Sequence, residues 1–302
     1  MRCPQLAILS LILLAGGNRT ASGDVLLSQD FSDAGLGQYT DAEMRSAFPE
    51  VPWTQGFNEG RATIVDDGRK GHGLEMFYPQ GTFGPGQGGG QAPLQFADGA
   101  VYDELVFSYS AMFRDGFDWQ KGGKLPGLAS GWQASGGNAA DGTNGFTARM
   151  MWRTGGKLVQ YVYHMDTPGG FGEDFTWQLD GEDVLLETDR WYDFRTRVKL
   201  NTPGEADGEI ESWLDGERAL HVTGLRFRTV NGVMIDNVYF STFFGGGDDT
   251  WAPDNDSRIV FDNFLVVDPD RRRAAVPEPA VIGFAALAVP LTLVRRRRIS
   301  PV

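Results

Sequence analysis

The chain has 302 residues, 41% of them hydrophobic and 12% aromatic, which is enough for one large domain core or two modest ones. Its 40 acidic and 27 basic residues give a formal net charge of −13, and we expect no nucleic-acid partner for so acidic a chain. The 41 glycines and the many short runs that alternate apolar with polar residues favour β-structure over a helical bundle.

The N-terminal residues 1–23 are typical of a secretory signal peptide. Arg2 precedes an apolar run from Leu6 to Ala15, small residues follow, and we expect cleavage after Gly23. The apolar run is too short to be a good membrane span. The only cysteine, Cys3, would leave with this peptide, so we expect a mature protein with neither a disulfide nor a thiol nucleophile.

Residues 81–90, GTFGPGQGGG, contain the formal spacing G-x-G-x-x-G at Gly84, Gly86 and Gly89. A dinucleotide site with this spacing needs a strand before it and a helix after it. A proline lies inside the motif, and GQAP follows it, so we predict a loop without a nucleotide.

Seven segments beyond this loop read as strands, because they alternate or are rich in β-branched and aromatic residues. They are residues 101–113, 145–152, 157–165, 191–200, 208–222, 237–244 and 258–267. Asp215-Gly216 is a two-residue hairpin signal within one of them. We therefore predict an all-β domain over residues 24–270, an antiparallel β-sandwich of the jelly-roll or concanavalin-like type. Residues 121–128, KGGKLPGL, read as a turn.

The strands at 145–152 and 157–165 would form a hairpin whose register places four polar side chains together. If residues 154–156 form a three-residue loop, Arg149 lies opposite Tyr161 and Thr147 lies opposite Tyr163. All four side chains then share one face, since residues two apart on a strand point the same way. A two-residue loop would instead place Arg149 on the face opposite both tyrosines.

This group of side chains suits an acidic sugar. An arginine can hold a carboxylate through two hydrogen bonds. A tyrosine can stack on a sugar, and it can transfer a proton if a neighbouring cation lowers its pKa from about 10. The alternative is a solvated face on which arginine stacks on tyrosine.

Several segments in this order resemble the alginate and glucuronan lyases of polysaccharide lyase family fourteen, over roughly Val101 to Val267. The matching segments are GGKLPGL (122–128), TAR (147–149), YVY (161–163), IDNVYFSTFFGG (235–246), WAP (251–253) and FDNF (261–264). The resemblance implies a secreted polysaccharide lyase with an anionic polysaccharide as its substrate.

The resemblance also implies a catalytic set, carried over residue by residue: Lys124, Arg149, Tyr161 and Tyr163. Thr147 occupies a position where the family has serine, and its hydroxyl is still able to bind substrate. We add Lys121 and Trp251 as candidate substrate-binding residues, although a surface position explains Lys121 equally well. A local basic patch would offset the overall acidity, and it comprises Lys121, Lys124, Arg149, Arg153 and Lys157.

The implied reaction is β-elimination on a polyuronate. Arg149 and Lys124 would neutralise the C6 carboxylate, which stabilises the charge that forms when the C5 proton leaves. A tyrosine would take that proton, and the same or the other tyrosine would donate one to the leaving oxygen. Lysine is an alternative base if burial lowers its pKa. This chemistry needs no redox cofactor and no metal.

Other patterns leave rival interpretations open. Glu209 and Glu211 lie two apart on one predicted strand, a placement that would suit the two acids of a jelly-roll glycoside hydrolase. A non-catalytic carbohydrate-binding matrix protein is a further alternative. The acidic loop 245–257 is either solvated or binds calcium. His164 alternates away from the tyrosines, which favours a packing or surface role.

The C-terminal residues 276–302 form a separate segment. Pro277-Glu278-Pro279 precedes an apolar run, Ala280 to Val294, and then four arginines, Arg295 to Arg298. This pattern resembles the PEP-CTERM sorting signal, which implies processing by exosortase-type machinery in a Gram-negative-type bacterium. Export through the inner membrane and a secreted or cell-surface location would follow, with membrane contact only through this segment. An ordinary tail anchor is the alternative.

Overall fold

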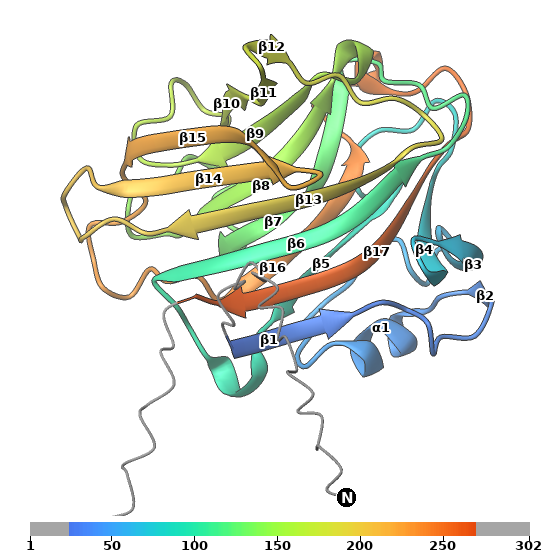
Figure 1. The fold of residues 1–302 in the computed structure, drawn as a ribbon, viewed down its shortest axis with the longest axis horizontal. Coiled ribbons are helices and arrows are strands. Elements are labelled where there is room, and N and C mark those ends of the chain that lie inside the picture. The colour runs from blue at the N-terminus through green and yellow to red at the C-terminus, as the bar shows by residue number, and fades with distance from the viewer. Residues whose placement is uncertain (1–23, 270–302) are drawn as a thin grey trace, which may run out of the picture. The chain divides into compact units, whose positions relative to one another are not determined.

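The computed structural model describes residues 24–269 (Figure 1). The predicted signal peptide (1–23) and sorting signal (276–302) lie outside the described residues. Within 24–269, no helix is both long enough and apolar enough to cross a membrane.

Two antiparallel sheets form the two layers of the fold, as predicted (Figure 1). The nine-stranded sheet contains, in spatial order, β15 (Glu217–Leu225), β14 (Gly208–Leu214), β13 (Trp191–Lys199), β6 (Glu104–Phe113), β17 (Ser257–Asp268), β4 (Gly71–Tyr78), β3 (Ala62–Gly68) and β2 (Gly37–Gln38), with β1 (Asp24–Gln29) paired to β17. The six-stranded sheet contains β10 (Glu173–Thr176), β9 (Leu158–Tyr163), β8 (Phe146–Arg153), β7 (Gly122–Ser130), β16 (Asn237–Phe244) and β5 (Gly90–Gln95).

Short elements complete the chain. They are helix α1 (Asp41–Ala47), the two-stranded pair β11 (Gln178–Leu179) and β12 (Glu182–Asp183), and the 3₁₀ turns η1 (Ala97–Gly99), η2 (Thr154–Gly156) and η3 (Asp249–Trp251). A capping box between Thr40 and Glu43 begins α1. Asp215 and Gly216 both have positive φ and join β14 to β15, as their sequence predicted.

The core lies between the two sheets, and strand alternation decides which side chains enter it. On β8, the residues Phe146, Ala148, Met150 and Trp152 belong to this core. The Trp152 ring contacts aromatic rings from both layers, namely Tyr78, Phe113, Phe117 and Phe244. The intervening residues of β8 therefore point to the outer face of the six-stranded sheet, away from the core.

Residues 121–128 are not the predicted turn, because most of them belong to the interior strand β7, which pairs with β8 and β16. The glycines serve close packing instead. A Cβ on Gly123 would lie 2.1 Å from the Trp152 ring, and one on Gly127 would lie 2.2 Å from the carbonyl oxygen of Ala148. Pro126 falls where the pairing with β8 shifts register, a position that tolerates a missing N–H.

The loop prediction for residues 81–90 agrees with the structure up to Gly90, where β5 begins. The buried Arg61 side chain holds this loop through hydrogen bonds from its guanidinium to the carbonyl oxygens of Pro85, Gly86 and Gly89. No helix follows the glycines, so the requirement of a dinucleotide site is not met.

Candidate active site

The hairpin of β8 and β9 has the predicted register. Residues 154–156 form the connecting turn η2, and Arg149 pairs with Tyr161 while Thr147 pairs with Tyr163. These four side chains lie on the outer face of the six-stranded sheet, between the core-facing residues of the same strands. They are buried nonetheless: Arg149 is 2% exposed, Tyr161 5% and Tyr163 1%.

Lys124 joins this group from β7, where it pairs with Met151 of β8. Its Nζ lies 4.0 Å from the centre of the Tyr161 ring and 2.8 Å from the Met151 Sδ. Burial lowers the pKa of Lys124 well below its ordinary value, and the positive charges of Arg149 and Arg153 lower this pKa further. A negative charge placed beside Lys124 would therefore raise its pKa and favour its charged form.

Arg149 is a buried cation with spare hydrogen-bond donors. Its Nη1 donates to Ser241 Oγ at 3.0 Å, and its guanidinium carbon lies 5.1 Å from the centre of the Tyr239 ring. The buried Nε has no hydrogen-bond partner. Among residues 24–269, neither Arg149 nor Lys124 forms an ion pair, and burial lowers the pKa of Arg149. A carboxylate that entered here would meet unpaired positive charge.

The two tyrosines stand edge to face, with ring centres 5.6 Å apart and hydroxyl oxygens 3.5 Å apart. Each hydroxyl oxygen accepts a backbone N–H: Gly172 donates to Tyr161 and Gly137 donates to Tyr163, both at 3.1 Å. Burial and the neighbouring Tyr163 hydroxyl raise the pKa of Tyr161, while Arg149 and the Gly172 N–H oppose this shift. Tyr161 thus keeps its proton at neutral pH.

Two loops cover the tyrosines. Ala134 and Ala140, from the loop between β7 and β8, belong to the same buried apolar cluster as both tyrosines. The loop between β9 and β10 supplies the Gly172 amide, and its exposed Phe171 ring reaches Gly137 of the first loop, to within 3.4 Å of a Cβ built there. A polymer can reach the tyrosine oxygens only if these loops move aside.

Thr147 has a different environment from the one expected for a substrate-binding residue. Its side chain is fully buried, and its hydroxyl donates to the carbonyl oxygen of Ala134 at 3.0 Å. The hydroxyl thus anchors the covering loop, and it is not presented to a substrate in this structure.

Lys121, Arg153 and Trp251 lie together beside Tyr161. The Arg153 guanidinium carbon is 5.4 Å from the centre of the Tyr161 ring and 5.9 Å from that of Trp251, and Arg153 forms two hydrogen bonds with Asp174, at 2.9 and 2.6 Å. The Lys121 Nζ lies 6.0 Å from the Trp251 ring centre. Of the two predicted binding residues, Trp251 packs against the cluster that contains both tyrosines, and Lys121 lies beside Trp251. Lys157, also assigned to the basic patch, instead pairs with Asp183.

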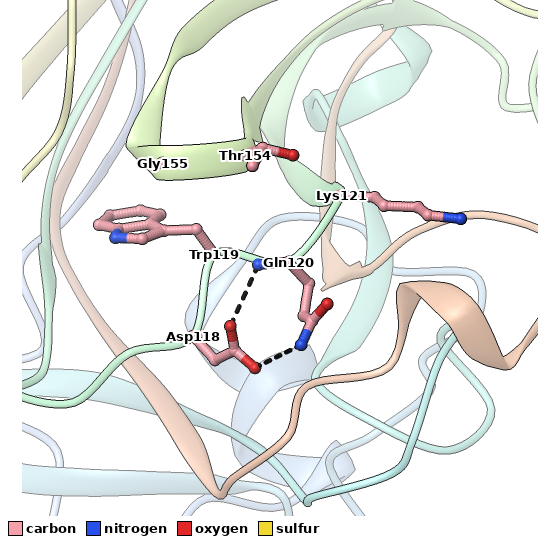
Figure 2. Close-up of a pocket in the computed structure, with 6 residues that line it drawn as sticks. All are labelled: Asp118, Trp119, Gln120, Lys121, Thr154 and Gly155. Carbon is pink, nitrogen blue, oxygen red and sulfur yellow. Dashed lines mark hydrogen bonds between the residues drawn. The ribbon is translucent and has the colours of Figure 1, made fainter.

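A shallow hollow of about 400 Å³ lies next to this region, lined by Asp118, Trp119, Gln120, Lys121, Thr154 and Gly155 (Figure 2). Gln120 closes one side of it through hydrogen bonds to Asp118 (Figure 2). The Lys121 side chain points away from the hollow (Figure 2). None of Lys124, Arg149, Tyr161 and Tyr163 lines it, so the hollow is separate from the candidate catalytic set.

The rival acids of the sequence do not form a catalytic pair. Glu209 and Glu211 lie on β14 in the nine-stranded sheet, where Arg197 binds both at 3.1 and 3.0 Å. Both acids thus pair with a cation on the nine-stranded sheet, whereas the candidate catalytic set lies on the six-stranded sheet. His164 packs in the interior with its Nε2 2.8 Å from Glu173, as its alternation favoured. Among the described residues, no group of three or more His, Cys, Asp or Glu side chains is placed to hold a metal.

Four contacting residues were missed by the sequence interpretation: Met151, Ser241, Tyr239 and Asp174. The alternation of Tyr239 and Ser241 in the strand NVYFSTFF would place both on one face, which was the available signal. Nothing local to Asp174 indicates its pairing with Arg153, because that contact depends on the third strand, β10.

Comparisons with known proteins identify the family and the fold. The model of the family Polysaccharide lyase 14 matches residues 66–264. The solved alginate lyase Aly36B is similar, with 27% identity, a TM-score of 0.70, and coverage of 80% of this chain and 96% of its own. The PL-14 alginate lyase from Aplysia kurodai has 22% identity and a TM-score of 0.68, covering 82% of this chain and 100% of its own.

An endo-β-1,4-glucuronan lyase from the fungus Trichoderma reesei shares the fold at 12% identity and a TM-score of 0.50, covering 82% of this chain and 99% of its own. No curated protein sequence matches the chain significantly. The family match includes β7, β8 and β9, and with them all four candidate catalytic residues. The chain is thus a polysaccharide lyase and belongs to the polysaccharide lyase 14 family.

Proposed function

We propose that the protein cleaves a polyuronate of the alginate or glucuronan type by β-elimination. The observation that carries this proposal is Arg149, a buried guanidinium without a carboxylate partner, beside Lys124 and two tyrosine hydroxyls. Buried cations are normally paired, and a uronate carboxylate is the missing partner that this arrangement suits. The similar lyase Aly36B, in a variant form, has been solved with an alginate tetrasaccharide.

In the proposed reaction, the carboxylate binds between Arg149 and Lys124, and its charge returns the pKa of Lys124 towards the ordinary value. Neutralisation of the carboxylate stabilises the negative charge that develops as the C5 proton leaves. Tyr163 accepts that proton in its deprotonated form. In the alternative, Lys124 is neutral and acts as the base, and Arg149 alone neutralises the carboxylate. Tyr161, which keeps its own proton, donates it to the glycosidic oxygen as the C4–O bond breaks and the C4–C5 double bond forms.

The basic residues beside Tyr161 extend the proposed site. Arg153 and Lys121 are positioned to bind the carboxylate of the next sugar, and Trp251 offers an aromatic surface between them. Arg153 already pairs with Asp174, so substrate would compete with that carboxylate.

The test is an assay of the purified protein with alginate, polymannuronate, polyguluronate and glucuronan, following the absorbance of the new C4–C5 double bond. Lys124→Ala and Tyr163→Phe should each remove most turnover while thermal unfolding still shows a folded protein. Lys157→Ala is the matched control, because its ion pair with Asp183 lies outside the site. Near-normal rates for both site variants would contradict the assignment, and binding without any double bond would indicate a non-catalytic protein.

We also propose export, on the sequence of both ends alone. Expression in a Gram-negative-type host that has exosortase machinery, followed by N-terminal sequencing of the exported protein, should give a mature chain that begins at Asp24. Retention of residues 1–23 in the cytoplasmic fraction would refute this part.

A further inference from the structure

A second aromatic group lies on the far side of Arg149 from Tyr161. The Tyr239 ring, over which the Arg149 guanidinium lies, is in edge contact with Trp53 at 6.3 Å between ring centres. Trp53 in turn meets Trp132 edge to face at 5.8 Å. The three rings are therefore continuous with the candidate catalytic group through Tyr239.

The order of the strands in the six-stranded sheet determines the order in which these side chains lie across its outer face. Tyr161 lies on β9 and Arg149 on β8, whereas Tyr239 lies on β16 and Trp53 lies in the segment that bridges to the edge strand β5. A polymer that crosses the strands from β9 towards β5 would thus pass Tyr161, then Arg149, then the two tryptophans.

Both tryptophans are held in place by bonds of their own segments. Backbone bridges from Glu50 to Gln95 and from Gln55 to Gln91 fix the chain on either side of Trp53. The Trp132 carbonyl oxygen accepts a hydrogen bond from the Ser135 hydroxyl at 2.6 Å. These bonds fix the backbone at both positions, and the edge contacts of Trp53 with Tyr239 and Trp132 restrict its ring, which lowers the entropy lost when a ligand binds.

The exposure of these rings is unequal. Tyr239 is buried, while Trp53 and Trp132 each remain half-buried and reach the surface. Beside them a chain of hydrogen bonds runs from the Tyr239 hydroxyl to Gln91 Oε1 at 2.8 Å, and from Gln91 Nε2 to Gln55 Oε1 at 3.0 Å. Flat aromatic surface next to neutral amide groups suits the apolar face and the hydroxyls of a sugar.

We propose that Trp53 and Trp132 form a sugar-binding subsite for the same anionic polysaccharide, on the β5 side of Arg149. This inference rests on the proposed function, and it adds a residue, Trp53, that lies outside the 66–264 span of the family match. The subsite fixes the direction of the polymer across the sheet and the shortest oligosaccharide that binds well.

The test compares Trp53→Ala and Trp132→Ala with Trp213→Ala. Trp213 is a half-buried tryptophan of β14 in the other sheet, stacked under Arg195, and is the matched control. KM and kcat are measured with uronate oligosaccharides of increasing length. Each subsite variant should raise KM for long substrates roughly fivefold to tenfold and leave kcat nearly unchanged. For the shortest oligomer that is cleaved, both KM and kcat should stay close to the wild-type values.

Retention in gels that contain the polyuronate gives a second readout, because it needs no turnover. Weaker retention of both subsite variants than of Trp213→Ala supports the subsite even if the wild-type protein forms no unsaturated products, a result that would refute only the proposed reaction. Kinetics and retention equal to those of Trp213→Ala at every length would overturn the subsite. Trp53→Phe and Trp132→Phe keep an aromatic ring and should recover most of the affinity; a loss of stability without any dependence on substrate length would show a packing role instead.

Discussion

The replacement Lys124→Met removes a charge and keeps the length of the side chain. In the wild-type protein the Lys124 ammonium packs against the Met151 sulfur and the Tyr161 ring, close to two further cations. The nearby acid, Asp174, is already bound by Arg153. A methionine suits the same surroundings without the cost of removing a charge from water.

The expected gain in the free energy of unfolding is the difference between two opposing contributions. Replacing a buried ion pair by apolar groups of similar size is neutral or stabilises proteins by about 1–4 kcal/mol in known cases, and we take this range for the Lys124 charge. The lost cation–π contact costs about 0.5–2 kcal/mol. We therefore expect Lys124→Met to raise the free energy of unfolding by about 1 kcal/mol, which corresponds to about 2–4 °C in Tm for a domain of this size.

The dependence on pH gives the sharper test. Below the lowered pKa of Lys124, the residue is charged in the folded and the unfolded protein, so the full cost of burying the charge is present. Between that pKa and the ordinary lysine value of 10.5, the folded wild type holds fewer protons than the unfolded chain, so its stability rises with pH. The difference in the free energy of unfolding between Lys124→Met and wild type should therefore shrink as the pH rises through this window.

Calorimetric unfolding of both proteins across this pH range measures the effect, with Lys121→Met as a control at an exposed lysine of the same segment. Two results would refute the view that the buried Lys124 charge destabilises the folded protein. One is a variant that is less stable than wild type at neutral pH, and the other is a difference in Tm that stays constant with pH. Whatever its stability, the Lys124→Met variant should have lost turnover at every pH.

Three further outcomes are expected. Arg149→Lys should lower turnover on polyuronate by about 100-fold or more in the absorbance assay, because lysine cannot reproduce the two-bond geometry. Thr147→Val should lower the free energy of unfolding in urea by about 1–3 kcal/mol, since it leaves the Ala134 carbonyl oxygen without its donor. Gly123→Ala should lower thermal stability by about 2 kcal/mol or more, because the new Cβ would overlap the Trp152 ring.

The changes at Thr147 and Gly123 each have a matched control. Thr147→Ser keeps the hydroxyl and should retain most of the stability that Thr147→Val loses. Gly232→Ala adds a methyl group where no atom lies within 4 Å, so it should leave Tm almost unchanged. Equal effects of a test variant and its control would contradict the role assigned to that residue. An Arg149→Lys enzyme with wild-type turnover would contradict the role assigned to Arg149.

The sequence predicted those features that depend on near neighbours in the chain. The hairpin register followed from a three-residue turn and strict alternation, and it correctly paired Arg149 with Tyr161. The error over β7 arose because its glycines meet Trp152 and Ala148 of the adjacent strand, partners that local turn propensity does not reveal.

The covering loops could not be predicted from the sequence either, since the amide of Gly137 donates to Tyr163 from 26 positions away in the chain. The same holds for the link from Arg149 to Ser241, which joins strands 92 residues apart. Which side chains become partners across such separations depends on the sheet order.

The central claim is elimination without water at a polyuronate linkage. The direct measurement is mass spectrometry of the products formed from alginate and glucuronan in water enriched in oxygen-18. The account predicts unsaturated oligosaccharides that carry no oxygen-18 from the cleavage step, and their loss in Tyr163→Phe. Saturated products labelled at the new reducing end would show hydrolysis and would contradict the account.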